Sequence, residues 1–489
     1  MTRVPGALAA LLFCSTPLAY AQTLADRVAR LPDGEVRMSF PSRPGVCGDG
    51  RSFVGDAASP DGMRIYFYGT EGGFNSTSPD FGEGCLPGPV RVSLLKTADG
   101  IADVRLYVGG AWRGTGQDLG TVAASDAAAY LLDISRAAPE RSVGTAILAA
   151  TLADSVQLTP RLITMGRDRD LRPLVRERAL RWLPEVSERE GTWDPAERAM
   201  RAIAEDGTDL VSVRDRAVRS LPESEATDAF LRSFYAKLGV TSLKDRVIRR
   251  LGETASPENV AWLRQRVVDG AEVSALRDRA IRVLGSDLGE RELLQQIYPR
   301  VAETQLRDRI IRVVGDQGDD ASQRWLQATV ENRGEPVSLR DRALRVLAER
   351  GATDYIRSVY PRLDDPALKE RAVRLESESG SSESHAWLRA IVLDEAETTG
   401  LRDRAVRSLA EAGYATDDLI RVYDVVKARS IRERLIRIFA ERSDRAAVDK
   451  LVAIAKNDPD EGLRRVAVRR LAETGDPRAK EFLEATVRR

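Results

Sequence analysis

A nine-residue block that recurs along the C-terminal three quarters of the chain constrains its fold more than any other feature. Four copies, at residues 213–221, 276–284, 339–347 and 401–409, follow one pattern: Val or Leu, Arg-Asp-Arg-Ala, an aliphatic residue, Arg, a variable residue and Leu. Divergent copies begin at Val175, Leu243, Leu306, Leu368, Ile431 and Leu463. The ten starts are 29 to 38 residues apart. This spacing indicates stacked supersecondary units, each too small to bury its apolar side alone.

Each block has the pattern of an amphipathic helix. Its first, fifth and ninth positions are expected to be apolar and fall at i, i+4 and i+8, with the aliphatic sixth position beside them. The third position is Asp or Glu in nine copies, and the seventh is Arg in all ten. An acid four residues before a base is the favourable order for a pair within one helix, although an exposed pair adds only about 0.3–0.5 kcal/mol. The acids and arginines of successive repeats could also interleave into a ladder.

The helices that precede the blocks alternate between two aromatic types. One type carries Trp262, Trp325 or Trp387, and the other carries Tyr235, Tyr298, Tyr360 or Tyr423. The full period is therefore two hairpins, about 63 residues. We interpret these aromatics as core between repeats, with a ligand-stacking row as the alternative. Pro299 and Pro361 are expected to kink their helices, and Gly252 and Gly315 are expected in loops between units.

The unit length, the paired helices and the Arg-x-x-Ala phrasing of the second helix resemble HEAT repeats. This resemblance implies a mainly α fold, an α-solenoid of about ten HEAT-like hairpins over residues 121–489. Residues 121–170 would be a diverged first repeat and residues 473–489 a closing cap. HEAT-like arrays serve as scaffolds and adaptors, and in one bilin-lyase branch as enzymes, so the resemblance specifies architecture more closely than function.

In HEAT-like arrays the second helix of each hairpin lines the concave side. Here that helix carries Arg or Lys at its second, fourth and seventh positions against one acid. The fourth positions would form a regular binding row: Arg216, Arg279, Arg309, Arg342 and Arg404. Such a row suits an acidic peptide, an acidic protein or an anionic envelope polymer. The alternative is that these arginines satisfy carboxylates and loop carbonyls between repeats.

Residues 22–120 predict a small, β-rich head in front of the solenoid. Apolar and polar residues alternate at 35–40, 63–68, 90–95 and 104–108, which is typical of half-buried strands in a mainly antiparallel sheet. A short helix is expected at 24–31 and a long glycine-rich loop at 71–85. Cys47 and Cys85 are expected to form a disulfide. A two-cysteine metal site is the alternative, but the chain's single histidine, His385, lies far away in the array.

Residues 1–21 have the features of a secretory signal peptide. Arg3 precedes a short apolar run at 7–12, and Ala-Tyr-Ala at 19–21 fits a cleavage site. The run is too short to span a bilayer, which takes about 20 residues, and Phe13 argues against lipidation of Cys14. We therefore expect export to the periplasm or secretion, without a membrane span.

The composition gives no general reason to expect nucleic acid or a membrane surface as partner, because Lys+Arg and Asp+Glu both number 75. One histidine leaves almost no base for Ser-His or Cys-His catalysis, and no phosphate-binding glycine motif follows a strand. We therefore expect no catalytic residue, cofactor or metal. The sequence predicts an exported scaffold or adaptor that binds a protein or peptide through the arginine-rich face. The alternative is an enzyme or small-ligand protein with its site in the head or at the junction of head and solenoid. The oligomeric state stays open.

Overall fold

The computed structural model describes residues 22–51, 53–56, 63–67, 73–76, 85–112, 116–316, 319–442 and 444–487. The expected signal peptide and most of the loop expected at 71–85 lie outside these residues. Two compact units divide the chain, Met1–Val247 and Ile248–Arg489, and each is described by itself.

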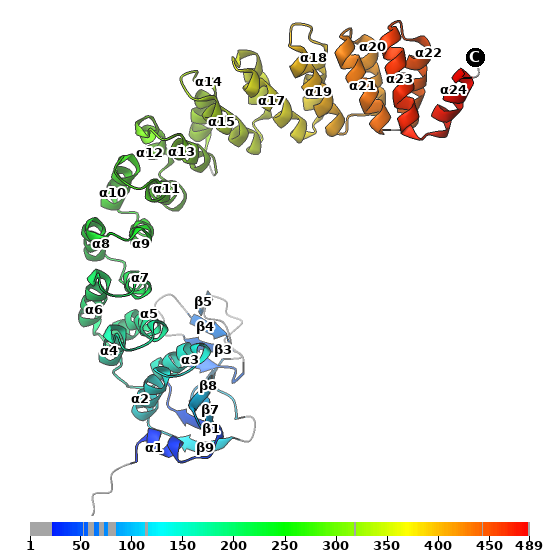
Figure 1. Ribbon diagram of the computed structural model, residues 1–489. Helices are drawn as coiled ribbons and strands as arrows, with labels where there is room; N and C mark the ends of the chain where they lie inside the picture. Colours follow the sequence, from blue (N-terminus) through cyan, green and yellow to red (C-terminus); the bar gives the residue numbers. More distant parts are fainter. Residues whose placement is uncertain are drawn as a thin grey trace, which may run out of the picture. The chain divides into compact units, whose positions relative to one another are not determined.

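A four-stranded sheet forms one half of the head (Figure 1). Its strand order is β8 (Gly100–Val108), β7 (Val90–Thr97), β1 (Gly34–Phe40) and β9 (Gln117–Thr121). Strand β1 pairs antiparallel with β7 and parallel with β9. Alternate residues such as Val92, Leu94 and Leu106 are buried, because successive side chains of a strand point to opposite faces. The alternation at 35–40, 90–95 and 104–108 therefore predicted these strands correctly.

A second, antiparallel sheet holds the disulfide. Its strands run in the order β5 (Gly73–Ser76), β4 (Met63–Phe67), β3 (Phe53–Asp56), β2 (Val46–Gly48) and β6 (Leu86–Pro87). Cys47 in β2 and Cys85, directly before β6, form the expected disulfide, with their Cα atoms 5.2 Å apart. The bond joins the two ends of the segment that contains β3, β4 and β5.

Helices make up the rest of the first unit. They are α1 (Leu24–Ala29), α2 (Ala124–Ser135), α3 (Glu140–Thr151), α4 (Thr159–Arg167), α5 (Pro173–Arg189), α6 (Trp193–Glu205), α7 (Val211–Arg219), α8 (Glu225–Lys237) and α9 (Thr241–Gly252), the last of which crosses into the second unit. Helix α3 packs on β8, and the backbone N–H of Val104 donates to Ser142 Oγ at 3.2 Å. This contact joins the head to the first helices.

The second unit consists of helical hairpins. Its helices are α10 (Pro257–Val268), α11 (Ser274–Arg282), α12 (Arg291–Ile297), α13 (Thr304–Asp316), α14 (Asp320–Glu331), α15 (Val337–Glu349), α16 (Thr353–Val359), α17 (Pro366–Ser379), α18 (Ser382–Leu393), α19 (Thr399–Glu411), α20 (Thr416–Val425), α21 (Arg429–Arg442), α22 (Arg445–Asn457), α23 (Glu461–Thr474) and α24 (Pro477–Val487). A π-helical turn, Val283–Asp287, extends α11.

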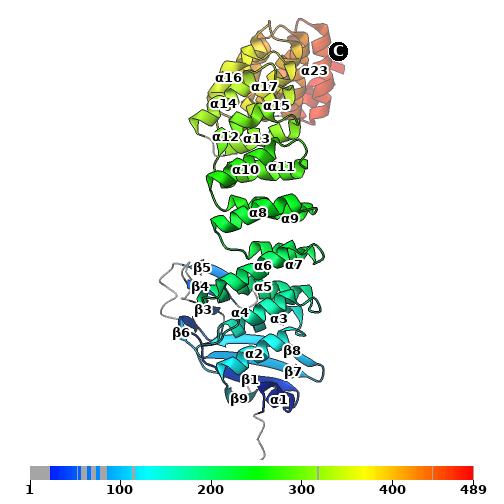
Figure 2. The same cartoon turned by 90° about the vertical axis from the view of Figure 1, so that its left-hand side faces the viewer.

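Each of the ten sequence blocks lies in the second helix of a hairpin, from α5 to α23 in odd numbers. Within the second unit these helices pack on one another in sequence, α11 on α13, α13 on α15 and so on to α23, as one continuous layer (Figure 1). Figure 2 shows α10 beside α11 and α12 beside α13, the two helices of each hairpin. In α11 the apolar positions Leu276, Ala280, Ile281 and Leu284 are buried. The structure therefore confirms an α-solenoid behind a small β-rich head with a disulfide.

Close helix packing, and not a loop, explains the glycines that follow the blocks. Gly252 ends α9 and Gly315 lies inside α13, so the expectation of loops there was wrong. A Cβ on Gly315 would lie 2.1 Å from Cγ1 of Val346 in α15, and one on Gly252 would lie 2.3 Å from Cγ1 of Val283. Glycine is needed here because the next second helix passes too close for any side chain.

The prolines change the final helical turn. Helix α12 ends at Ile297 and a 3-10 turn follows at Tyr298–Arg300; α16 ends at Val359 before the equivalent turn Tyr360–Arg362. Proline has no N–H to donate to the preceding turn. The α-helix therefore ends before Pro299 and Pro361 instead of continuing with the expected kink.

Candidate interaction surface

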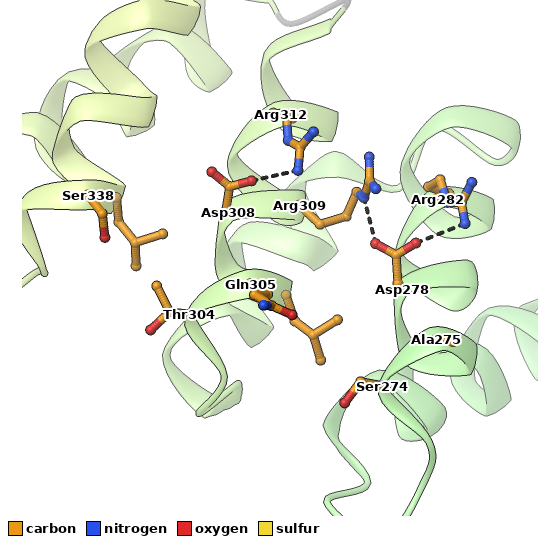
Figure 3. A pocket seen from close by; sticks show the side chains of 12 residues that line it. Ser274, Ala275, Asp278, Arg282, Thr304, Gln305, Asp308, Arg309, Arg312 and Ser338 are labelled. Atoms are coloured by element: carbon orange, nitrogen blue, oxygen red, sulfur yellow. Dashed lines mark hydrogen bonds and ion pairs between the residues drawn. The ribbon is translucent and has the colours of Figure 1, made fainter.

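A ladder of shared carboxylates connects successive second helices. In α11, Asp278 Oδ1 accepts a hydrogen bond from Nε of Arg309 in α13 at 2.6 Å, and its Oδ2 pairs with Arg282 of its own helix at 2.8 Å (Figure 3). One step further, Asp308 of α13 accepts from Nε of Arg342 in α15 at 2.5 Å and from Arg312 at 2.6 Å. Both third-position acids are therefore held by a seventh-position arginine of their own helix and a fourth-position arginine of the next second helix.

The same arrangement repeats along the array. Asp341 joins Arg345 and Arg371, and Asp403 joins Arg407 and Arg434. In the first unit Asp215 joins Arg219 and Arg246. The ladder, which the sequence left as a possibility, is thus a regular feature of the fold.

The ladder leaves hydrogen-bond donors in excess. Each step contributes two guanidinium groups against one carboxylate, so it carries one net positive charge. At Asp278 both carboxylate oxygens are already engaged, whereas a guanidinium has five N–H donors and each arginine of the pair directs only part of them at the acid. A ligand on this face therefore meets N–H donors without a matching set of free acceptors.

Asp308 stays ionised in the ladder. Burial alone would raise the pKa of Asp308, but the hydrogen bond from Arg342 and the charges of Arg342 and Arg312 outweigh burial and lower this pKa below its usual value. Because these ion pairs are partly exposed, each pair by itself contributes little to stability.

A hollow lies on this face over α11, α13 and α15. Its volume is about 640 Å³. Residues from the N-terminal ends of the three helices and from the ladder line it (Figure 3): Ser274, Ala275, Asp278, Arg282, Thr304, Gln305, Leu306, Asp308, Arg309, Arg312, Ser338 and Leu339. Val273 and Val337, the chain neighbours of Ser274 and Ser338, are exposed. We call this hollow the α11–α15 groove.

The predicted binding row divides into several environments. Arg309 and Arg342 occupy ladder positions on neighbouring helices, and Arg309 also lines the groove. Arg404 in α19 lies 3.4 Å from Glu370. Arg279 lies on α11. Arg216 lies on α7 in the first unit, where no described carboxylate forms an ion pair with it.

The second-position arginines are not part of the surface, which corrects the expectation that they add to the basic face. Arg277 and Arg340 are 2% and 3% exposed. Nε of Arg277 donates to the carbonyl of Val267 at 2.8 Å, and Nε of Arg340 donates to the carbonyl of Val330 at 2.8 Å. These carbonyls belong to the last turn of the preceding helix, where intrahelical donors are missing. The arginine therefore ties together the two helices of one hairpin.

The position of the second residue on a helical wheel predicts that its side chain is buried. At about 100° per residue, the second position lies about 100° from the first, between the ninth at about 80° and the sixth at about 140°. It is therefore in the middle of the apolar stripe. The third, fourth and seventh positions fall on the opposite side, where the ladder forms.

The other hairpin type holds its second-position cation differently. Arg307 lies over the ring of Tyr298 at 4.3 Å, and Arg432 lies over the ring of Tyr423 at 4.5 Å. Lys244 over Tyr235 and Lys369 over Tyr360 repeat the arrangement at 4.8 and 4.9 Å.

The tyrosines are core residues, as expected. Tyr298 and Tyr423 are 5% and 2% exposed. Tyr298 also meets Trp325 of the next hairpin edge-on, with ring centroids 5.1 Å apart, and Tyr360 meets Trp387 in the same way. The aromatic residues therefore pack between repeats.

The described residues contain no group of three or more His, Cys, Asp and Glu side chains placed to hold a metal ion. His385, in the first turn of α18, packs edge-on against Tyr414 with ring centroids 5.2 Å apart. Among the same residues, no helix combines the length and the apolar character needed to cross a bilayer.

Stacked two-helix hairpins define the α-solenoid class. Residues 427–489 match the family described as HEAT repeats. This last part of the array is therefore similar to HEAT repeats, and the rest of the array is built from the same two-helix unit.

Comparison with other known proteins adds no partner. No curated protein matches the chain. Human deoxyhypusine hydroxylase in complex with glycerol is 15% identical over 60% of this chain and 98% of that chain, with a TM-score of 0.23. An importin beta structure is 13% identical over 66% and 52% of the two chains, TM-score 0.28, and yeast importin-beta is 11% identical over 73% and 57%, TM-score 0.30. This chain thus spans little more than half of either importin. Similarity this low gives no guide to activity or partner.

Proposed function

We propose that the protein is an exported, non-catalytic scaffold that binds an acidic, extended segment of a protein partner along the α11–α15 groove. The observation that carries this proposal is the donor excess of the ladder. The acids of the groove are already shared between arginines, so the groove offers guanidinium N–H groups and one net positive charge per step.

The donor excess favours acidic ligands. Carboxylates are the natural complement, because charge-assisted hydrogen bonds to guanidinium are roughly twice as strong as neutral ones. A basic segment would have to displace an arginine from Asp278 or Asp308, and each of these acids has two arginine partners.

The form of the groove favours an extended ligand. It crosses three successive helices, and Ser274, Thr304 and Ser338 place hydroxyl groups along it. The exposed Val273 and Val337 beside it offer apolar contact two hairpins apart. An extended chain can reach such a series of shallow contacts, whereas a compact small molecule would cover only one step.

Export is part of the proposal. The disulfide between Cys47 and Cys85 supports it, because such bonds persist in oxidising compartments and are rare in the cytosol. The signal features of residues 1–21 point the same way. The partner is then expected in the periplasm or outside the cell.

Peptide titration of the mature chain, residues 22–489, tests the groove. The probes are two fluorescein-labelled peptides of about twelve residues, one alternating Glu with Ser and the other Lys with Ser, followed by fluorescence anisotropy. We expect binding of the acidic peptide only, weakening as salt is raised because exposed charges are screened. The double variant Arg282→Gln/Arg312→Gln is expected to bind the acidic peptide at least about tenfold more weakly.

Arg421→Gln is the matched control. Arg421 is 70% exposed on α20, in the layer of first helices, and pairs with Asp418 of its own helix. Equal weakening by Arg421→Gln would mean diffuse charge attraction and would contradict the groove. Equal affinity for the lysine peptide would contradict the preference for acid. Absence of binding to either peptide would contradict the proposal and favour the alternative, a small-ligand site in the head.

A further inference from the structure

One step of the ladder is incomplete. At complete steps the fourth-position Nε donates to an aspartate of the preceding copy, as Arg246 does to Asp215 and Arg309 does to Asp278, each at 2.6 Å. Arg216 of α7 occupies the same position. Its Nε is buried and has no hydrogen-bond partner among the described residues, and no described carboxylate lies within ion-pair distance.

The acid that should complete this step is Glu177 in α5. Glutamate is one methylene longer than aspartate, and the carboxylate of Glu177 forms no ion pair with Arg216 among the described residues. The other step at which a glutamate faces an arginine is also loose. There Glu370 and Arg404 are 3.4 Å apart, and Nε of Arg404 likewise has no hydrogen bond.

The surroundings of Arg216 are unfavourable for an unpaired cation. Burial lowers the pKa of Arg216, and the nearby charges of Arg219, Arg181 and Arg178 lower it further, while the charge of Glu177 acts in the opposite direction. The guanidinium still stays protonated at neutral pH. Folding has thus placed a half-buried positive charge in a positive neighbourhood without its counter-charge.

We propose that Arg216 binds an oxyanion from outside the chain, a carboxylate or a phosphate group, in the place that aspartate occupies at the complete steps. The site is preorganised, because the guanidinium is already partly desolvated and held by its helix, so an incoming anion bears less of that cost. It lies in the first unit and does not depend on the α11–α15 groove.

Two variants test the site from opposite directions. Arg216→Gln removes the cation, and Glu177→Asp shortens the acid so that the chain completes its own step. Calorimetric titration of residues 22–489 with inorganic phosphate, and separately with a blocked Ser-Asp-Ser peptide, measures binding. We expect the wild type to bind at least one of these probes, and both variants to bind it at least about tenfold more weakly.

Arg198→Gln is the control, because Arg198 is an exposed arginine on α6 in the same unit. It changes the net charge as Arg216→Gln does and is expected to leave affinity unchanged. Binding of phosphate alone would assign the site to a phosphate group, and binding of the peptide alone would assign it to a partner's carboxylate. No binding of either probe, or full binding by Glu177→Asp, would overturn the proposal. Glu177→Asp keeps the charge and the test valid if Arg216→Gln fails to fold.

Discussion

Nε of Arg340 donates a hydrogen bond to the carbonyl oxygen of Val330, ten residues earlier in the chain, at 2.8 Å. A second nitrogen of the same guanidinium donates to Oδ1 of Asp364 at 2.8 Å. One buried side chain thus joins α14 to α15 and reaches the loop before α17. Arg277 makes the equivalent bonds to Val267 and Glu303.

Arg340→Met is expected to lower the free energy of unfolding by about 1–3 kcal/mol, because it leaves a buried carbonyl without its donor and removes one of the two arginines that pair with Asp364. Arg345→Met is the control. Arg345 is a ladder arginine with a 32% exposed side chain, and its loss is expected to cost less than about 1 kcal/mol. Urea unfolding followed by circular dichroism measures both. Equal losses of unfolding free energy would contradict the conclusion that the buried Arg340 stabilises the fold more than the ladder arginine Arg345 does.

Gly315→Ala is expected to destabilise the array by about 1–3 kcal/mol, because the new methyl group would overlap Val346, whose Cγ1 would lie 2.1 Å away. Gly400→Ala is the matched control in helix α19, where a Cβ meets nothing within 4 Å. There alanine is expected to be neutral or stabilising by up to about 1 kcal/mol, since glycine is the weaker helix former. Adding Val346→Ala to Gly315→Ala should recover part of the loss. The melting temperatures of the wild type, the two single glycine variants and the double variant measure these differences.

Acid is expected to weaken the ladder. The folded-state pKa of Asp308 is below its usual value of 3.8, so ionised Asp308 contributes stability that is present above about pH 3.8 and is lost as the pH falls through the folded-state pKa. Asp308→Asn removes this contribution, and its stability should therefore depend less on pH below 4. Unfolding midpoints at pH 3 to 7 measure the difference. An unchanged slope would contradict the pairing of Asp308 with Arg312 and Arg342.

Replacing Cys47 and Cys85 with alanine is expected to destabilise the head and leave the array folded. The bond closes a loop with a sequence separation of 38 residues, worth about 4 kcal/mol in the chain-entropy model. Limited proteolysis should cut the variant's head faster while a stable fragment of the helical array remains. Loss of the array together with the head would show that the disulfide supports both.

The sequence predicted the array well because repetition is visible without a structure. The apolar positions of each block, its acid and its seventh arginine indicated a helix and the possibility of a ladder, and ten copies made the pattern secure. Strands β1, β4, β7 and β8 were also predicted, because they alternate over at least five residues. Strands β2, β3, β5 and β6 have four residues or fewer, too few for alternation to be recognised.

The site was predicted only in part. The row of fourth-position arginines was correctly placed on the second helices, but a row in sequence did not reveal that Arg309 is paired and Arg216 is not. The preceding acid is Asp278 for Arg309 and Glu177, one methylene longer, for Arg216, and whether acid and arginine meet is visible only when the two helices are packed. The packing of Gly315 against Val346 was missed for the same reason, since the two belong to different hairpins.

The alternation between a carbonyl-bound arginine, as in Arg277, and a cation over tyrosine, as in Arg307, makes neighbouring hairpins different in kind. Arrays of nearly identical units are prone to misassembly during folding. From the hairpin of α7 to that of α21, the nearest hairpin of the same kind is two places away, so an exchange there must skip an intervening hairpin. The same difference restricts how the array can lengthen by gene duplication. Duplication of one hairpin would place two hairpins of the same kind side by side, whereas duplication of two hairpins, about 63 residues, would keep the alternation.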